Sequence, residues 1–86
     1  MIVTVTGIAQ KQYKDKTTGM VNIYTKCHGI YKFGKADNEN GNKSKGQQVI
    51  EFYVDNGDFD FIDVDKKMSL DFDQKGRLID YELLDD

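Results

Sequence analysis

Residues 20–33 read MVNIYTKCHGIYKF, and apolar and polar side chains alternate along most of this stretch. Alternation with a period of two, in β-branched and aromatic residues, is typical of a β-strand that buries one face. We therefore predict one long strand over these residues. One face carries Val21, Ile23, Thr25 and Cys27, and the other carries Asn22, Tyr24, Lys26 and His28.

Gly29 interrupts this strand pattern. A glycine inside a strand commonly marks a bulge or a sharp bend, which small barrels need where one strand curls across both halves of the sheet. We expect such a corner at Gly29. Without a bulge, Tyr31 and Phe33 share the face of Ile23, whereas a bulge reverses them, so their facing stays open.

Four further stretches alternate in the same way and are predicted to be strands: residues 2–9, 47–54, 68–73 and 77–84. In the third and fourth predicted strands, one face carries Ile50, Phe52, Val54, Met68, Leu70 and Phe72. In the last strand, Ile79, Tyr81 and Leu83 are expected to share a face. The opposite positions are mostly polar, which indicates a sheet with one side against a core.

The segments between the strands are polar. Residues 10–19 are rich in lysine and end in the turn signal TTG, so we expect a loop or the tip of a long hairpin. Residues 34–46 are expected to form a flexible polar loop. Residues 55–58 read as a turn and residues 74–76 as a tight hairpin turn. Residues 59–64 fit either irregular structure or a single helical turn, and we expect irregular structure.

No helical periodicity persists anywhere in the chain of 86 residues. The pattern predicts a single all-β domain over residues 1–86, a five-stranded OB-like Greek-key barrel. An SH3-like small barrel or a simple meander would give nearly the same pattern. Because the core of so small a domain is thin, we also expect a homodimer that adds apolar contact.

Composition excludes several classes of function. The chain has one Cys and one His, so neither a zinc site nor Cys/His catalysis is expected. No phosphate-binding loop, serine nucleophile motif or dinucleotide fingerprint is present, so we expect a non-enzyme without cofactor or metal. Short apolar runs predict no membrane span, and a strand pattern directly at the N-terminus predicts a cytoplasmic protein.

Charge is segregated along the chain. Residues 1–50 carry eight lysines and three carboxylates, a balance of +5, whereas residues 51–86 carry four basic side chains and twelve carboxylates, a balance of −8. Such asymmetry is typical of a protein with one cationic face for a polyanion and an acidic remainder. Solvated lysine loops on an ordinary fold are the simpler explanation.

Aromatic and basic residues interleave in the basic part, as single-stranded nucleic acid binding requires: cations follow the phosphates and aromatic faces stack on the bases. The candidate nucleic-acid-binding residues are Tyr13, Lys14, Lys16, Tyr24, Lys26, His28, Tyr31, Lys32, Phe33, Lys35, Lys43 and Lys45. Structural roles are the alternative for several of them. Tyr31 and Phe33 can be core residues, and His28 can be an ordinary polar strand residue.

The acidic part offers two further patterns. Residues 71–82 match a calcium-binding EF-hand loop at several positions, but Lys75 stands where an oxygen ligand is needed and no helix can follow. We therefore expect a hairpin there rather than a calcium site. The aspartates of residues 55–73 can protect a sheet edge from aggregation or dock a basic protein partner.

The layout as a whole resembles the small OB-fold single-stranded-DNA-binding proteins of filamentous phages and related mobile elements. The likeness lies in length, in the polar hairpin ending at Thr18-Gly19 before a long aromatic strand, and in the closing hairpin from Gly76. It implies a symmetric dimer that binds single strands without chemistry and protects replication or transfer intermediates, with Tyr24 and Tyr31 at the family's aromatic positions. The single arginine and the long loop of residues 34–46 depart from that family.

The sequence thus predicts non-specific binding of single-stranded DNA. Two alternatives stay open. One is a protein-interaction or adaptor domain of a phage or conjugative element that uses its acidic face against a basic partner. The other is binding of single-stranded RNA, which differs by its 2′-OH.

Overall fold

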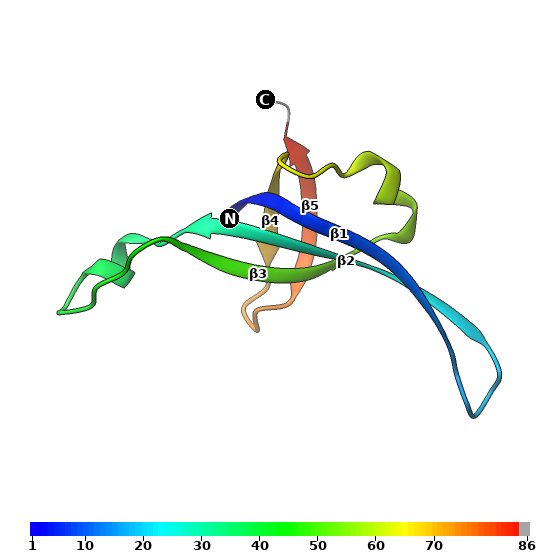
Figure 1. Cartoon of the computed structure of the whole chain (residues 1–86). Coiled ribbons are helices and arrows are strands. Elements are labelled where there is room, and N and C mark those ends of the chain that lie inside the picture. The colour runs from blue at the N-terminus through cyan, green and yellow to red at the C-terminus, as the bar shows by residue number, and fades with distance from the viewer. Residues whose placement is uncertain (85–86) are drawn as a thin grey trace.

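The computed structural model describes residues 1–84, apart from the side chain of Ala36. These residues form one antiparallel sheet of five strands and the segments that connect them (Figure 1). The strands are β1 (Ile2–Lys14), β2 (Val21–Lys32), β3 (Gln47–Val54), β4 (Lys67–Phe72) and β5 (Leu78–Leu84). Two short 3-10 helices, η1 (Lys35–Asn38) and η2 (Asn56–Phe61), lie before and after β3. In the sheet, the strands follow the order β3-β2-β1-β4-β5.

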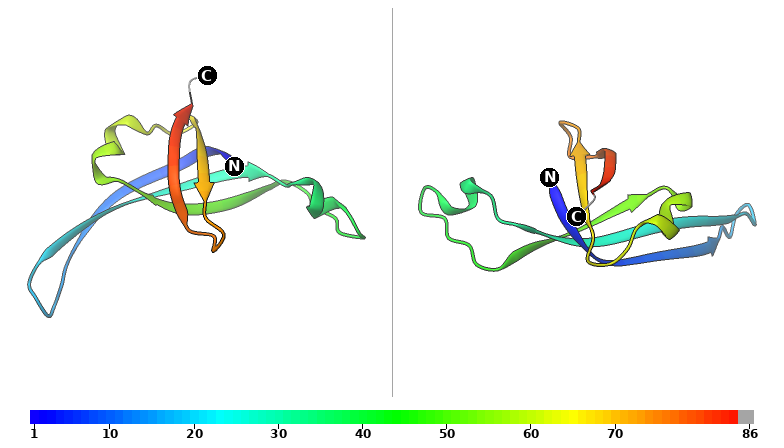
Figure 2. Two further views of the ribbon diagram at one scale, coloured as in Figure 1. Left: turned by 180° about the vertical axis from the view of Figure 1, so that it is seen from behind. Right: turned by 90° about the horizontal axis from the view of Figure 1, so that it is seen from above.

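β1 is the central strand and joins β2 and β3 on one side to β4 and β5 on the other. Its first residues pair with both neighbours, since Thr4 is the register partner of Ile30 on β2 and of Lys67 on β4. Beyond β4, β1 continues with β2 alone, and residues 11–24 form a two-stranded hairpin arm that projects from the sheet (Figure 2). The arm and the segment of residues 34–46 lie at opposite ends of a molecule that measures 52 × 32 × 22 Å.

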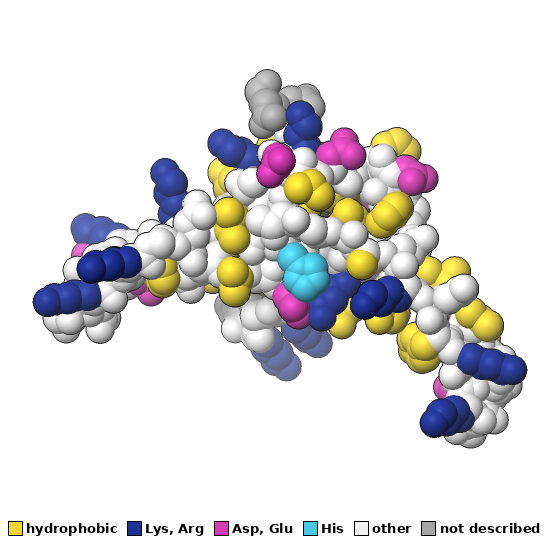
Figure 3. Space-filling model, viewed as in Figure 1, with side chains coloured by type: hydrophobic (Ala, Val, Ile, Leu, Met, Phe, Trp, Pro, Cys, Tyr) yellow, Lys and Arg dark blue, Asp and Glu magenta, His cyan; other side chains and the backbone are white. Residues whose placement is uncertain are grey.

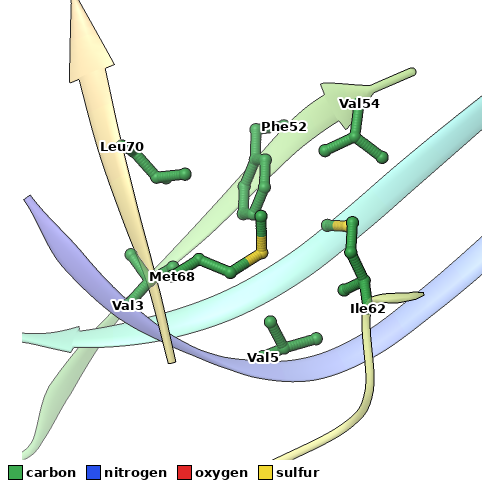
Figure 4. Packing of buried hydrophobic residues seen from close by; sticks show 8 residues of the cluster. Val3, Val5, Phe52, Val54, Ile62, Met68 and Leu70 are labelled. Atoms are coloured by element: carbon green, nitrogen blue, oxygen red, sulfur yellow. The ribbon is translucent and has the colours of Figure 1, made fainter. Parts of the chain in front are cut away.

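The core lies on one side of the sheet, where β4 and β5 fold over β1, β2 and β3. It consists of alternate strand residues and Ile62, which follows η2 (Figure 4): Val3, Val5, Cys27, Phe52, Val54, Ile62, Met68 and Leu70. Burial raises the pKa of the Cys27 thiol to about 11. The predicted inward faces of the third and fourth strands are confirmed, because Phe52, Val54, Met68 and Leu70 are buried.

The all-β prediction is confirmed, but the sheet is not closed into a barrel by hydrogen bonds, because β3 and β5 are its two edges. The side chain of Tyr81 connects these two edges instead. The Tyr81 hydroxyl on β5 accepts a hydrogen bond of 2.9 Å from the backbone N–H of Asp55, directly after β3, and donates one to Asp58. Both bonds tie the end of β3 and η2 to β5.

The irregular structure expected over residues 59–64 is wrong in its first part, because η2 runs through Phe61. Asn56 anchors η2 to β2: its side-chain oxygen accepts a bond of 2.9 Å from the Thr25 hydroxyl, and its amide donates one of 3.0 Å to the Ile23 carbonyl. A helix of six residues is too short for its periodicity to be recognised in a sequence.

The bulge expected at Gly29 lies in the opposite strand. The register shifts between Val5 and Gly7 of β1, while β2 pairs with β3 without interruption. Gly29 is needed for close packing instead, since a Cβ there would lie 3.2 Å from the Thr4 carbonyl oxygen. β2 therefore alternates strictly, and Tyr31 is directed to the core side.

A second bulge, between β4 and β5, makes the facing of the last strand differ from the prediction. The register of β4 and β5 shifts between Asp71 and Phe72, so Phe72 pairs with Leu78. Leu78 packs against the core and Ile79 is 65% exposed. The prediction that Ile79 shares the face of Tyr81 is therefore wrong.

The connecting segments agree with the turn signals. β1 extends to Lys14, so the hairpin-tip alternative for residues 10–19 is confirmed. Asp15 holds the turn by accepting bonds from the backbone N–H groups of Thr17 and Thr18, and Gly19 has a φ of 75°. Residues 34–46 contain η1 and no strand, and their flexibility stays a prediction. No helix within residues 1–84 is long and apolar enough to cross a membrane.

Candidate nucleic-acid interface

The side of β1, β2 and β3 that faces away from the core is called the outer face here. Because β2 has no bulge, its outer positions follow one another without interruption: Tyr24, Lys26, His28, Ile30 and Lys32. Figure 3 looks onto this face, with the single histidine near its centre and basic side chains toward both ends. The β4–β5 hairpin lies on the other side of the sheet (Figure 2).

Three tyrosines from three strands form a row on the outer face. The ring centroids of Tyr13 on β1 and Tyr24 on β2 are 6.1 Å apart, and those of Tyr24 and Tyr53 on β3 are also 6.1 Å apart. The neighbouring rings are tilted or edge-on to each other, at 55° and 69°. Tyr13 is 56% exposed and Tyr53 is 61% exposed, so the row offers aromatic surface to a ligand.

Lys26 lies beside this row and is already paired. Its Nζ is 5.9 Å from the centroid of the Tyr53 ring and 2.8 Å from Oε2 of Glu51. The other oxygen of Glu51 is 3.4 Å from Nδ1 of His28. The hydrogen bond with Glu51 raises the pKa of Lys26, and the same bond lowers the pKa of Glu51. A phosphate that binds Lys26 must therefore compete with this carboxylate.

A hollow of about 240 Å³ lies among these side chains, lined by Ala9, Lys11, Tyr24, Lys26, His28 and Tyr53. Small residues of β1 leave room for it, because Ala9 is the register partner of Lys26 and Gly7 is the partner of His28. The hollow therefore combines cations with the faces or edges of two tyrosines.

The twelve predicted site residues do not form one continuous patch. Lys14 and Lys16 lie at the end of the hairpin arm, and both are exposed. Lys35, Lys43 and Lys45 lie at the opposite end of the molecule, in the segment of residues 34–46, where Lys35 is 3.6 Å from Glu39.

Tyr31 is not on the outer face, and Phe33 lies beyond the paired part of β2. Tyr31 packs against the core, and its hydroxyl donates a bond of 3.1 Å to the Gln48 side chain on the same side of β3. Phe33 follows the end of β2 and is half-buried. Of the predicted aromatic residues, Tyr13 and Tyr24 are the two that belong to the row on the outer face.

Sequence reasoning missed Tyr53, Lys11 and Glu51 as members of this face. The alternation of β3 places Glu51 and Tyr53 on its polar side, which was a usable signal. Their meeting with His28 and Lys26 depends on the register between β2 and β3, which no local pattern reveals.

Three aspartates line a separate groove. A groove of about 490 Å³ between the two sheet edges is lined by Tyr53, Val54, Asp55, Asp58, Leu78, Ile79, Asp80 and Tyr81. Burial and the bond to Asp58 raise the pKa of Tyr81 to about 12. Within residues 1–84, no group of three or more His, Cys, Asp or Glu is placed to hold a metal ion.

The EF-hand-like pattern corresponds to the β4–β5 turn. The carboxylate of Asp73 accepts bonds from the backbone N–H groups of Lys75 and Arg77 and from Nε of Arg77. These bonds, led by the backbone bond from Arg77, lower the pKa of Asp73. The hairpin predicted there is confirmed, and the structure shows that Asp73 holds its turn.

Comparison of the chain with models of protein families, with curated protein sequences and with solved structures finds no match. The resemblance to phage single-stranded-DNA-binding proteins stays a prediction. The chemistry of the outer face is therefore the basis for the function proposed below.

Proposed function

We propose that this protein binds single-stranded DNA along the outer face of β1, β2 and β3, without sequence preference and without catalysis. The observation that carries the proposal is the row of Tyr13, Tyr24 and Tyr53, with 6.1 Å between neighbouring rings. Each ring comes from a different strand, so a nucleic acid strand that crosses the sheet meets all three.

Stacking supplies the affinity in this proposal. A base that stacks on an exposed aromatic side chain contributes about 1–3 kcal/mol, and every base has a π-face, so the contact tolerates any sequence. Tyr13 and Tyr53 are more than half exposed, and the cost of leaving them in water is recovered when bases cover them. A row of rings also favours a flexible strand over a duplex, whose bases are stacked internally.

The lysines supply electrostatic attraction. Lys11 and Lys26 border the central hollow, and Lys14 and Lys16 extend the positive charge along the hairpin arm. The aspartates of the β3–β5 groove line a different cavity from Lys11 and Lys26, and Tyr53 borders both cavities. A local positive face of this kind attracts phosphates even though the net charge of the chain is −3.

The topology supports an OB-like domain as the finer description of the fold. OB-folds are partly open five-stranded Greek-key barrels that bind oligonucleotides with the face of strands 2 and 3 and with the loop between strands 1 and 2. Here β2, β3 and the hairpin arm carry the tyrosines, and β1 pairs with both β2 and β4. The sheet edges β3 and β5 and the thin core favour a homodimer, and protection of replication or transfer intermediates in the cytoplasm is the role we propose.

Fluorescence anisotropy of labelled oligo-dT tests the proposal at about 50 and about 200 mM salt, because loss of phosphate contacts makes affinity fall steeply over this interval. Tyr24→Ala and Tyr53→Ala should each weaken binding about 5- to 100-fold, the equivalent of one lost stacking contact. Phe61→Ala is the matched control, since Phe61 is 69% exposed but lies on η2. Absence of binding by the wild type at low salt, or equal affinity of all three variants, would disprove the proposal. Competition by oligo-U distinguishes RNA binding.

The acidic groove favours a second candidate function, the docking of a basic protein segment. Asp55, Asp58 and Asp80 line this groove together with the exposed Ile79, so the groove offers carboxylates beside apolar surface. Combined replacement of Asp55, Asp58 and Asp80 by asparagine should abolish capture of a lysine-rich peptide and leave oligo-dT affinity unchanged or higher. Peptide binding that survives these replacements would remove this candidate.

A further inference from the structure

A second hollow, of about 410 Å³, lies where β1 begins and β2 ends. It is lined by Met1, Ile2, Thr4, Ile30, Tyr31, Lys32, Gln47 and Lys67. The register of the strands also places several of these residues next to one another. Thr4 lies between Ile30 and Lys67, and Lys32 is the partner of Gln47.

Most residues that line this second hollow are on the same face as the tyrosine row, although Tyr31, which packs against the core, also lines it. Tyr24, Ile30 and Lys32 occupy positions of equal parity on β2, which pairs with β3 without a bulge from Thr25 to Lys32. At about 3.3 Å per residue, the distance along β2 from Tyr24 to Lys32 is about 26 Å. A single strand that follows β2 from the tyrosines therefore arrives at the second hollow.

The side chains of this hollow match the two halves of a nucleotide. Lys32 and Lys67 are exposed at its rim, and within residues 1–84 neither has a carboxylate partner, in contrast to Lys26 with Glu51. Its lining also has an apolar part, called its floor here, which consists of the half-buried Ile30 and of Ile2, which is 59% exposed. A free anion would not use the apolar floor, and an apolar peptide would not need the two lysines.

We propose that the second hollow is a nucleotide subsite of the same DNA-binding face, with Lys32 and Lys67 on a phosphate and with Ile2 and Ile30 against a base. This inference rests on the proposed function and adds Lys67 as a binding residue. Lys67 comes from the acidic part of the sequence, and its pairing with Thr4 brings it to the basic face. The subsite also extends the bound strand beyond the three tyrosines.

The first test is Lys67→Gln, measured with an oligo-dT of about 12 nucleotides, within the roughly 4–16 nucleotides that OB domains bind. We expect about 3- to 10-fold weaker binding and a salt slope reduced by about 0.7, the value for one lost phosphate contact on a single strand. Lys75→Gln is the control with the same charge change, because Lys75 lies in the β4–β5 turn on the other side of the sheet. Lys75→Gln should bind like the wild type.

The second test detects the base directly. The chain has no tryptophan, so Ile2→Trp introduces a single indole at the floor of the hollow. Oligo-dT should quench this fluorescence, and addition of Lys67→Gln should reduce the quenching. Circular dichroism of each variant confirms that the sheet is retained.

The outcomes separate the subsite from the proposed function. The subsite alone is overturned if Tyr24→Ala weakens oligo-dT binding while Lys67→Gln behaves like Lys75→Gln and the introduced indole is not quenched. Both are overturned if the wild type does not bind oligo-dT at low salt. Weaker binding by Lys67→Gln together with indole quenching supports both.

Discussion

The inner and outer faces of β1, β2 and β3 are built from alternate residues of the same strands, yet they differ in what covers them. On the inner face, Cys27 and Phe52 are at most 4% exposed, because β4 and Ile62 pack over them. On the outer face, their neighbours on the strands remain accessible, and Tyr53 is 61% exposed. The inner face therefore stabilises the fold, whereas the outer face has aromatic surface that the chain itself does not bury.

The largest expected effect comes from the adjacent residues Phe52 and Tyr53, which point to opposite faces of β3. Phe52→Ala should lower the free energy of unfolding by about 3–5 kcal/mol, because it removes a buried ring and leaves a cavity. Tyr53→Ala should lower it by less than about 1 kcal/mol, since its ring is mostly exposed. Urea denaturation measures both. Equal losses would mean that the outer face is as important for folding as the inner face.

Two glycines test the comparison of the inner and outer faces further, and their replacement is expected to have the next largest effect on stability. Gly29→Ala should cost about 1–3 kcal/mol, because the new Cβ would lie 3.2 Å from the Thr4 carbonyl oxygen inside the sheet. Gly7→Ala should change stability by less than about 0.5 kcal/mol, since its Cβ would meet only the His28 ring, at 4.0 Å. Thermal unfolding of the two variants measures the difference. A tolerated alanine at Gly29 would show that β1 can move away from β2 at no cost.

The smallest expected effect is a gain in affinity for oligo-dT rather than a loss. Glu51→Gln should strengthen oligo-dT binding about 2- to 5-fold, because it frees Lys26 and His28 and removes a negative charge from the outer face. Its stability should change by less than about 0.5 kcal/mol, as is usual for an exposed ion pair. Asp60→Asn is the control with the same charge change and should leave binding unchanged, because Asp60 lies on η2, which is anchored through Asn56 to the buried Thr25 on the core side of β2. Weaker binding by Glu51→Gln would mean that the carboxylate positions Lys26 rather than competing for it.

The positions of the strands were largely predictable from the sequence. The predicted strand over residues 47–54 coincides with β3, and the others differ from the observed strands mainly at their ends. Alternation is a local property that each strand carries by itself, because successive side chains point to opposite faces. For the same reason, the inward facing of Phe52 and Met68 was predicted correctly.

Apart from the short helix η2, the errors share one physical cause, which is that bulges and strand partners are properties of pairs of strands. The register shift opposite Gly29 lies in β1, and the shift near Phe72 turns Ile79 outward. The sequence of one strand does not say which partner carries the extra residue. Tyr53 was missed because its contact with Tyr24 depends on the β2–β3 register.

By itself, the sequence determined an all-β chain, the inward faces of β3 and β4, its hairpin turns and the segregation of its charges, because these depend on neighbouring residues. Only the tertiary structure decided that β1 pairs with both β2 and β4, that the sheet edges β3 and β5 are joined through Tyr81 rather than by a ladder, and that Tyr13, Tyr24 and Tyr53 form a row. These features depend on long-range register, in which residues far apart in the chain are brought together to bury one common core.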